Sequence, residues 1–280
     1  MLKIFQSRIL TAGLFLFFLI FFSGCSSIRI GYKFLDDYLD HQADKYFDLN
    51  SDQDKVVSKW SNDFKAWHRA NEVPVYIKKI DEVLTRIETG EKFKPEEIVT
   101  LIHEIRDRIS SYRDKFIPDF VSFLGTVSDK QIEHLKEAYA DSNTEISEKL
   151  EDSDEDLLDD RKDKLTEDLE DWFGTVSEEQ MEAVMKRQEP PRKRIEARLE
   201  RRKKNQELFL ELLQFRNDPE KLKSELRAYT DNMIYVPGYQ DSEKDYAEFS
   251  AGFLNGINEK QKKNLIKKLK SYRADFKSLL

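Results

Sequence analysis

The sequence has a single cysteine, few residues that interrupt helices, and no pattern typical of strands. Its 280 residues include 9 glycines and 7 prolines, and Cys25 is its one cysteine, which excludes a disulfide within the chain. Apolar residues recur at three- and four-residue spacings and never alternate strictly with polar ones. We therefore predict an all-α protein. Apolar residues suffice to line one face of each helix but not to fill a thick core, so we expect a thin, elongated shape.

The sequence also lacks the short motifs of common enzyme classes. It has neither a Gly-rich phosphate loop nor a Gly-x-Ser-x-Gly elbow. No two of its four histidines have the spacing of three or four that a helical metal site uses. We expect no catalytic residue, no cofactor and no metal, unless histidines from separate helices converge. Surface or interfacial positions are expected for all four, His41, His68, His103 and His134.

The N-terminal segment, residues 1–25, has the order of an export signal. Lys3 and Arg8 precede an unbroken apolar run over residues 14–22, which is too short for a comfortable membrane span. The end of this segment, Phe22-Ser23-Gly24-Cys25, resembles a bacterial lipobox. That resemblance implies a signal peptide over residues 1–24 and a lipid on Cys25. An ordinary cleaved signal with a leftover cysteine is the alternative.

Sorting and charge define the expected location and partners. Ser26 after the cysteine, under the sorting rule that the lipobox resemblance implies, favours an outer-membrane lipoprotein that faces the periplasm. Residues 1–25 hold two bases and no acid, so the mature chain has 45 basic and 55 acidic residues, a net charge of -10. This balance disfavours nucleic acid and anionic lipid headgroups as general partners.

One short pattern occurs four times, and each copy has the form of a helix start. Asn or Ser is a preferred N-cap, and a Gln three residues later can accept a hydrogen bond from the N-cap amide and so complete a capping box. Four copies with the same Gln are more than helix capping requires. The four cap and Gln pairs are Asn50 and Gln53, Ser128 and Gln131, Ser177 and Gln180, and Asn258 and Gln261.

Apolar periodicity and helix-breaking residues place the helices between these caps. Pro118 is expected to kink or end the helix that starts after Pro95, and the Ser128 helix is expected to continue without a break toward residue 172. An acidic stretch over 145–171 and a basic one over 186–204 suggest two antiparallel paired helices. The expected helices cover residues 30–47, 51–72, 75–89, 95 onward, 128 onward, 192–215, 219 onward and 258–280.

The spacing of the four caps indicates an internal duplication. The caps fall at positions 50, 128, 177 and 258, so the first and last spacings, 78 and 81, nearly agree. A shift of 130 along the sequence aligns Phe123 with Phe253, and a shift of 127 aligns Gln53 with Gln180. We therefore expect an anchor and first helix over residues 25–48, a first helical unit over 49–172 and a second over 173–280.

The four copies resemble the LTxxQ signature of the Spy and CpxP family of periplasmic proteins. In Spy, a small helical subunit with two such motifs pairs with a second subunit into a thin curved cradle that acts as an ATP-independent chaperone. CpxP-like relatives regulate an envelope-stress sensor, and some relatives bind metal. This chain lacks the Leu-Thr pair. Its mature N-terminus and Trp67-His68-Arg69 also resemble an uncharacterised family of Gram-negative lipoproteins.

The resemblance leads to a functional expectation with alternatives. Two tandem Spy-like units could form one cradle within a single chain and hold unfolded envelope proteins as clients. An envelope adaptor or stress-sensor partner is one alternative, and a passive structural lipoprotein is another. Aromatic residues could line a concave binding surface, and the candidates are Trp60, Trp67, Phe209 and Phe215.

Overall fold

The computed structural model describes residues 27–235 and 240–280, and every regular element in them is helical. Two of the described helices precede the first cap. The helices of the first half are α2 (Ser27–Lys33), α3 (Leu35–Phe47), α4 (Ser51–Asn71), α5 (Val73–Thr89), α6 (Pro95–Leu124) and α7 (Asp129–Ser147), followed by the 3₁₀ turn η1 (Glu148–Leu150).

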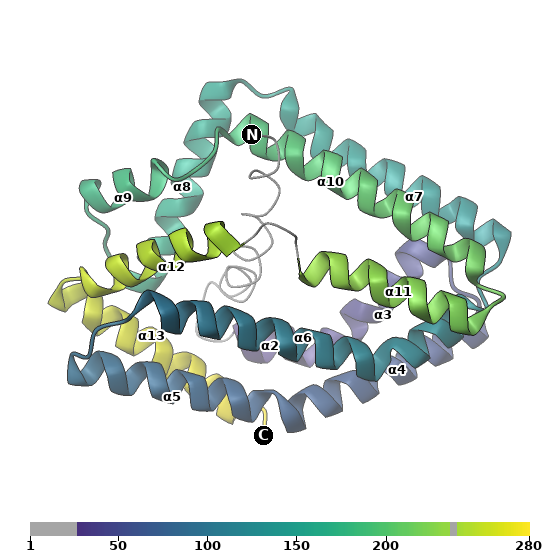
Figure 1. The fold of residues 1–280 in the computed structure, drawn as a ribbon, viewed down its shortest axis with the longest axis horizontal. Coiled ribbons are helices and arrows are strands. Elements are labelled where there is room, and N and C mark those ends of the chain that lie inside the picture. Colours follow the sequence, from purple (N-terminus) through teal and green to yellow (C-terminus); the bar gives the residue numbers. More distant parts are fainter. Residues whose placement is uncertain (1–26, 236–239) are drawn as a thin grey trace.

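The second half has the same mixture of long and short helices. They are α8 (Asp154–Phe173), α9 (Glu178–Met185), α10 (Pro191–Leu212), the turn η2 (Leu213–Phe215), α11 (Pro219–Ile234), α12 (Gln240–Asn255) and α13 (Glu259–Lys277). The helices follow one another around a rim, and the molecule is elongated (Figure 1). Helices far apart in sequence lie together on this rim: α5 packs on α13, and α6 packs on both α11 and α12. The prediction of an elongated all-α protein is confirmed.

Two separate apolar clusters lie at opposite ends of the molecule. The first core lies at the end where α3, α4, α7 and the C-terminal end of α6 meet. It includes Phe123, Leu124 and Leu135, together with Leu213 and Leu222 from the second half. The second core, between α5, α8 and α13, includes Leu84, Phe173 and Leu265. Both cores therefore use helices from both predicted units, and the boundary between those units stays a prediction.

One expected helix boundary is wrong, and of the two outcomes expected at Pro118 the end of the helix is excluded. Helix α6 continues through Pro118 to Leu124, because Phe116 and Phe120 on either side of the proline both pack on Trp60 of α4. The helix that begins after Ser128 does not reach residue 172, because Ser153 caps a new helix by accepting a hydrogen bond from the backbone N–H of Asp156 at 3.1 Å.

The carbonyls released at this break have a partner on α10. The Arg192 guanidinium donates to the carbonyl oxygens of Leu150 and Asp152, each at 2.6 Å, and it also pairs with Asp154. This contact joins the start of the basic segment to the start of α8. Beyond this contact, α10 runs along α7. There Arg202 of α10 donates to Asn143 Oδ1 of α7 at 3.1 Å. The acidic and basic segments therefore meet around the starts of α8 and α10, where α10 contacts both α8 and η1, and Arg161 of α8 also donates to Gln188 Oε1 at 2.8 Å.

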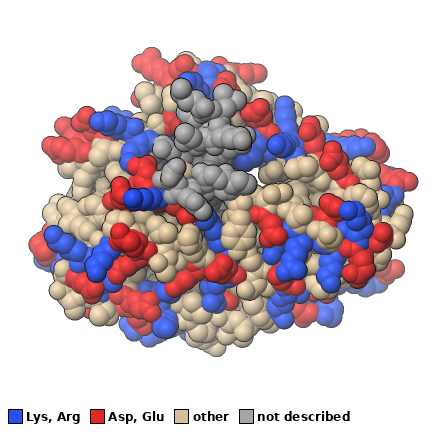
Figure 2. Space-filling model, in the orientation of Figure 1, with Lys and Arg blue, Asp and Glu red and all other residues tan. Residues whose placement is uncertain are grey.

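The surface carries both signs of charge in close mixture. Acidic and basic side chains alternate over the face drawn in Figure 2, with uncharged areas between them. Many of these charges form exposed pairs within one helix, such as Lys59 with Asp63 at 2.5 Å. Among residues 27–235 and 240–280, no helix combines the length and apolar character needed to cross a bilayer.

Candidate functional site

All four capping boxes form, and each opens a helix. In each box the cap side chain accepts from the Gln backbone N–H, and the Gln side-chain oxygen accepts from the cap N–H, as the sequence predicts. At Ser128, for example, the N–H donates to Gln131 Oε1 at 3.0 Å and Oγ accepts from the Gln131 N–H at 3.3 Å. The four boxes start α4, α7, α9 and α13.

The first two boxes meet each other. Gln131 Nε2 donates to Gln53 Oε1 at 2.6 Å, and Gln53 Nε2 donates back to Gln131 Oε1 at 3.2 Å. The two amides also bind the turns before each other's helix, because Gln131 Nε2 donates to the Asp48 carbonyl and Gln53 Nε2 donates to the Thr126 carbonyl, both at 3.2 Å. This arrangement, which we call the first Gln pair, is buried beside the first core.

The third and fourth boxes meet in the same way at the other end of the molecule. Gln261 Nε2 donates to Gln180 Oε1 at 2.7 Å, and Gln180 Nε2 donates back to Gln261 Oε1 at 3.3 Å. Gln261 Nε2 also donates to the Thr175 carbonyl at 2.7 Å, and the shift of 127 aligns Thr175 with Asp48. We call this arrangement the second Gln pair. Its recurrence supports the interpretation of an internal duplication.

The aromatic rings that precede the motifs also form similar pairs at the two ends of the molecule. Phe47 and Phe123 meet nearly edge-on beside the first Gln pair, with ring centroids 5.2 Å apart. Phe173 and Phe253 meet in a similar way beside the second Gln pair, also at 5.2 Å. The sequence predicted neither these ring pairs nor the meeting of one Gln with another, although the similar spacings of the caps, 78 and 81, were the available signal.

The side-chain amides of the Gln pairs form their hydrogen bonds within the protein. Both amide hydrogens of Gln131 and both of Gln261 have acceptors within the protein, so these groups are satisfied without a ligand. Buried amides that donate and accept at fixed positions stabilise one arrangement of the helix starts. The Gln pairs are therefore suited to joining helices, and they leave little capacity for binding another molecule.

Trp60 and Trp67, two of the four candidate aromatics, lie together in a cluster between α4 and α6. Trp60 stacks on Phe64 with centroids 5.7 Å apart, and Trp67 meets Tyr112 edge-on at 4.9 Å. Ring contacts continue from one residue to the next along both helices. The aromatic cluster consists of Trp60, Phe64, Trp67, Tyr112, Phe116 and Phe120.

The edge of the aromatic cluster reaches solvent. Phe120 is 38% exposed, and Val56, one turn before Trp60 on α4, is 49% exposed. The ammonium group of Lys115 lies 5.6 Å from the Phe116 ring centroid and 5.9 Å from that of Trp67, which places a cation at the rim. The cluster is thus an apolar surface with charged neighbours.

Phe209 and Phe215, the other two candidates, lie elsewhere. Phe209 packs against the first core and contacts Tyr229 at 5.8 Å between centroids. Phe215 lies in η2 with Lys221 Nζ 5.2 Å from its ring centroid. The four candidates therefore do not form one surface.

A buried polar network closes the other end of the aromatic cluster. Glu72, at the joint between α4 and α5, accepts two hydrogen bonds from Arg108 at 2.6 and 2.7 Å. His68 Nε2 lies 3.1 Å from the Tyr76 hydroxyl. Burial lowers the pKa of His68 and raises the pKa of Tyr76 to about 12. Because these groups come from α4, α5 and α6, the network fixes the angle at which the three helices meet.

The remaining histidines lie apart from one another. His103 faces the buried carboxylate of Glu243 at 3.0 Å, and His134 Nε2 lies 3.0 Å from the Lys45 carbonyl. His41 is exposed on α3. Over residues 27–235 and 240–280, no three side chains of His, Cys, Asp or Glu gather in a way that could hold a metal ion.

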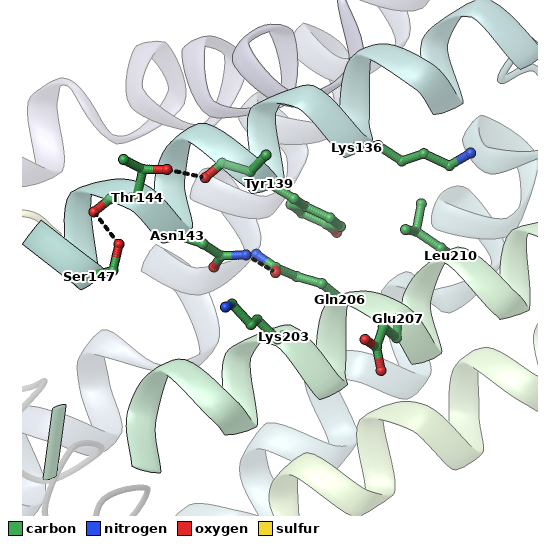
Figure 3. A pocket seen from close by; sticks show the side chains of 10 residues that line it. Lys136, Tyr139, Asn143, Thr144, Ser147, Lys203, Gln206, Glu207 and Leu210 are labelled. Atoms are coloured by element: carbon green, nitrogen blue, oxygen red, sulfur yellow. Dashed lines mark hydrogen bonds between the residues drawn. The ribbon is translucent and has the colours of Figure 1, made fainter. Parts of the chain in front are cut away.

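One open pocket of about 410 Å³ lies between α7 and α10. Its floor holds Asn143 Nδ2, which donates to Gln206 Oε1 at 2.8 Å, while Lys136 and Lys203 extend along its edges (Figure 3). Gln206 Nε2 is buried, and no described residue accepts a hydrogen bond from it. The pocket is lined by both polar and apolar side chains, and no pattern in the sequence indicated it.

Cys25, the predicted site of lipid attachment, falls outside the described residues.

Comparison with known proteins identifies a family but no named relative. Neither a curated protein nor a solved structure matches the chain. A family described as "Family of unknown function (DUF6279)" matches residues 45–236. That match contains the first three capping boxes and the whole aromatic cluster. The chain belongs to this family of unknown function, DUF6279.

Proposed function

We propose that this protein is a lipid-anchored protein of the cell envelope that binds other proteins and holds unfolded or partly folded ones without ATP. The observation that carries the proposal is the partly exposed aromatic cluster between α4 and α6, with charged side chains at its rim. Aromatic and apolar edges bind exposed apolar segments of a client, and the proposal includes no catalytic step and no cofactor.

The surroundings of the cluster favour weak and reversible binding. Phe120 is its strongly exposed member, and Val56 is exposed one turn before Trp60, so a client buries a small apolar area and gains little affinity. Nearby charged pairs such as Lys59 with Asp63 stay in water and keep the surface soluble. A client that binds weakly also leaves without an energy source. The resemblance of the four capping boxes to the Spy and CpxP signature supports the same class of function.

Location rests on the N-terminal sequence, residues 1–26. The lipobox-like segment before Cys25 supports attachment of a lipid, and Ser26 supports the outer membrane, with the protein facing the periplasm. Replacement of Cys25 with Ser is expected to move the protein to the soluble periplasmic fraction or to block its processing. Membrane fractionation that is unchanged by Cys25→Ser, with no incorporated lipid label in the original protein, would contradict the anchor.

Client holding is tested by light scattering from a destabilised protein that aggregates. Residues 26–280 in several-fold molar excess should suppress aggregation, and Val56→Gln with Phe120→Gln should reduce that suppression at least threefold. Leu158→Gln is the matched control, since Leu158 is 45% exposed but lies on α8, away from the cluster. Circular dichroism should show equal helicity for all variants.

The outcomes separate the alternatives. No suppression by the unmodified chain rules out client holding. If a single envelope protein is then recovered with it at a fixed stoichiometry, the result supports an adaptor or stress-sensor partner instead. Absence of both activities supports a passive structural lipoprotein.

A further inference from the structure

A row of exposed apolar side chains runs along α2 and α3. Ile30, Phe34 and Tyr38 are spaced four residues apart and are 55%, 50% and 55% exposed. Backbone hydrogen bonds of the helical i to i−4 type connect them across the junction of α2 and α3, from the Phe34 N–H to the Ile30 carbonyl at 3.3 Å and from the Tyr38 N–H to the Phe34 carbonyl at 2.9 Å. The three side chains therefore share one face of a nearly continuous helix.

The other face of the same helix is fixed to the body of the protein. Ile28 and Tyr32 are buried, and Ile28 belongs to a cluster with Val73 and Phe276. The Tyr32 hydroxyl donates to the Lys65 carbonyl at 2.9 Å, and Lys65 Nζ donates to the Lys33 carbonyl at 2.8 Å. The exposed row is thus held in one direction, because α2 cannot rotate without breaking these contacts.

We propose that the row formed by Ile30, Phe34 and Tyr38 lies against the lipid bilayer and gives the protein a second membrane contact that sets its orientation. This inference rests on the proposed lipid at Cys25. Ile30 is five residues after Cys25, and five residues of chain span at most about 17 Å. The row is therefore confined to the neighbourhood of the membrane surface in a tethered protein.

The chemistry of the row fits the bilayer interface. Aromatic side chains with a polar tip, such as Tyr38, are favoured at the level of the headgroups, and isoleucine and phenylalanine are favoured below it. Lys33 Nζ lies 5.3 Å from the Phe34 ring centroid, where its ammonium can stay among the headgroups while the ring enters. Four aspartates on α3 offset the positive charge of nearby bases such as Lys33. The lipid surface that fits this balance is therefore zwitterionic rather than anionic.

Three side chains alone bind a membrane weakly, and the tether makes the contact effective. A covalent anchor this close to the row raises the effective concentration of the row at the bilayer to the millimolar range or higher. The contact then needs little affinity of its own. Its consequence is that the exposed face of α2 and α3 lies on the membrane; Figure 1 shows α2 and α3 behind α6 and α11.

The test uses the lipidated full-length protein in vesicles of phosphatidylcholine and phosphatidylethanolamine. Lipid attachment consumes the only thiol, so Asp37→Cys, on the exposed side of α3, introduces a unique labelling site. A fluorophore there should be quenched by doxyl-labelled lipid at least fivefold more than the same fluorophore at Glu200→Cys, an exposed position on α10. Replacing all three row residues with Ser in the Asp37→Cys protein should lower the quenching to the α10 value.

Each failure has a distinct signature. Equal quenching at the two positions in a protein that floats with the vesicles overturns the proposed contact and leaves the anchor intact. A free Cys25 thiol, or a mass without acyl chains, shows instead that the anchor itself is wrong. Quenching at residue 37 that falls as protein is added at constant lipid means that a second copy covers the row, which also overturns the proposal.

Discussion

The two ends of the molecule contain the same hydrogen-bonded Gln pair in different packing. Gln53 and Gln131 are both buried beside the larger, first core, and they start α4 and α7. At the other end Gln261 is buried, but Gln180 is partly exposed and starts the short helix α9. The capping chemistry is thus kept while the packing around it differs. This comparison indicates that the motif sets where helices begin, whereas the apolar clusters set how stable each end is.

The largest expected difference between the ends lies in their cores. Leu135 and Leu265 are equivalent under the shift of 130, and both are buried. Leu135→Ala should lower the free energy of unfolding by about 3–4 kcal/mol, and Leu265→Ala by about 2–3 kcal/mol, since the smaller cluster can close around the cavity more easily. Urea denaturation of both variants measures the difference. A larger loss for Leu265→Ala would show that the second end is the more tightly packed.

The second-largest expected difference in stability is between the two Gln pairs. Gln131→Ala removes a cap partner, takes away the hydrogen bond that the Asp48 carbonyl accepts from Gln131, and breaks both bonds between the two Gln amides, so we expect a loss of about 2–3 kcal/mol. Gln180→Ala exposes its partner to water and should cost about 1 kcal/mol. The control compares Gln53→Ala and Gln131→Ala with the double variant. If capping alone matters, the two single losses add up to that of the double variant; if the amides depend on each other, their sum exceeds it.

The helix starts were predictable because capping is local. A cap and its Gln are three residues apart, so the residues themselves carry the signal at Ser128 or Asn258. The meeting of Gln53 with Gln131 joins positions that are 78 residues apart, and no local pattern specifies it. Pro118 shows the reverse case, in which a local signal could have ended the helix but the ring contacts of Phe116 and Phe120 with Trp60 accompany a helix that continues.

The candidate surface was predictable only in part for the same reason. Trp60, Phe64 and Trp67 follow helical spacing and could be assigned to one face of α4 from the sequence. That Phe116 and Phe120 complete the cluster depends on how α5 and its turns bring α6 back against α4. The break at Ser153 was hidden by the surrounding acids, although Ser153 had the form of a cap.

Two glycines that end helices allow a further comparison of stability. Gly174 and Gly90 both end helices with positive φ, 76° and 75°. A Cβ at Gly174 would lie 1.9 Å from Asn264 Nδ2, which donates to the Phe173 carbonyl, whereas a Cβ at Gly90 would meet nothing. Gly174→Ala should therefore cost about 2 kcal/mol and Gly90→Ala about 1 kcal/mol, the usual penalty for this backbone conformation. Thermal unfolding of the two variants tests this order, and equal losses would show that Asn264 moves aside freely.

The smallest expected effect concerns Asp48, which is the C-cap of the helix before the first motif, as Gly174 is the C-cap of the helix before the third. Both residues end the helix before a motif, and Asp48 has φ 47°, a left-handed conformation that costs an ordinary side chain energy. Asp48→Gly keeps the carbonyl that accepts from Gln131 and loses an exposed 3.5 Å ion pair with Lys130, which contributes little. Relief of the backbone strain should raise the free energy of unfolding. The greater freedom of glycine in the unfolded chain offsets part of this gain, which leaves about 0.5 kcal/mol. A urea midpoint that rises with an unchanged slope supports this; a lower midpoint would mean that the Asp48 side chain, which the second end lacks, stabilises the first Gln pair.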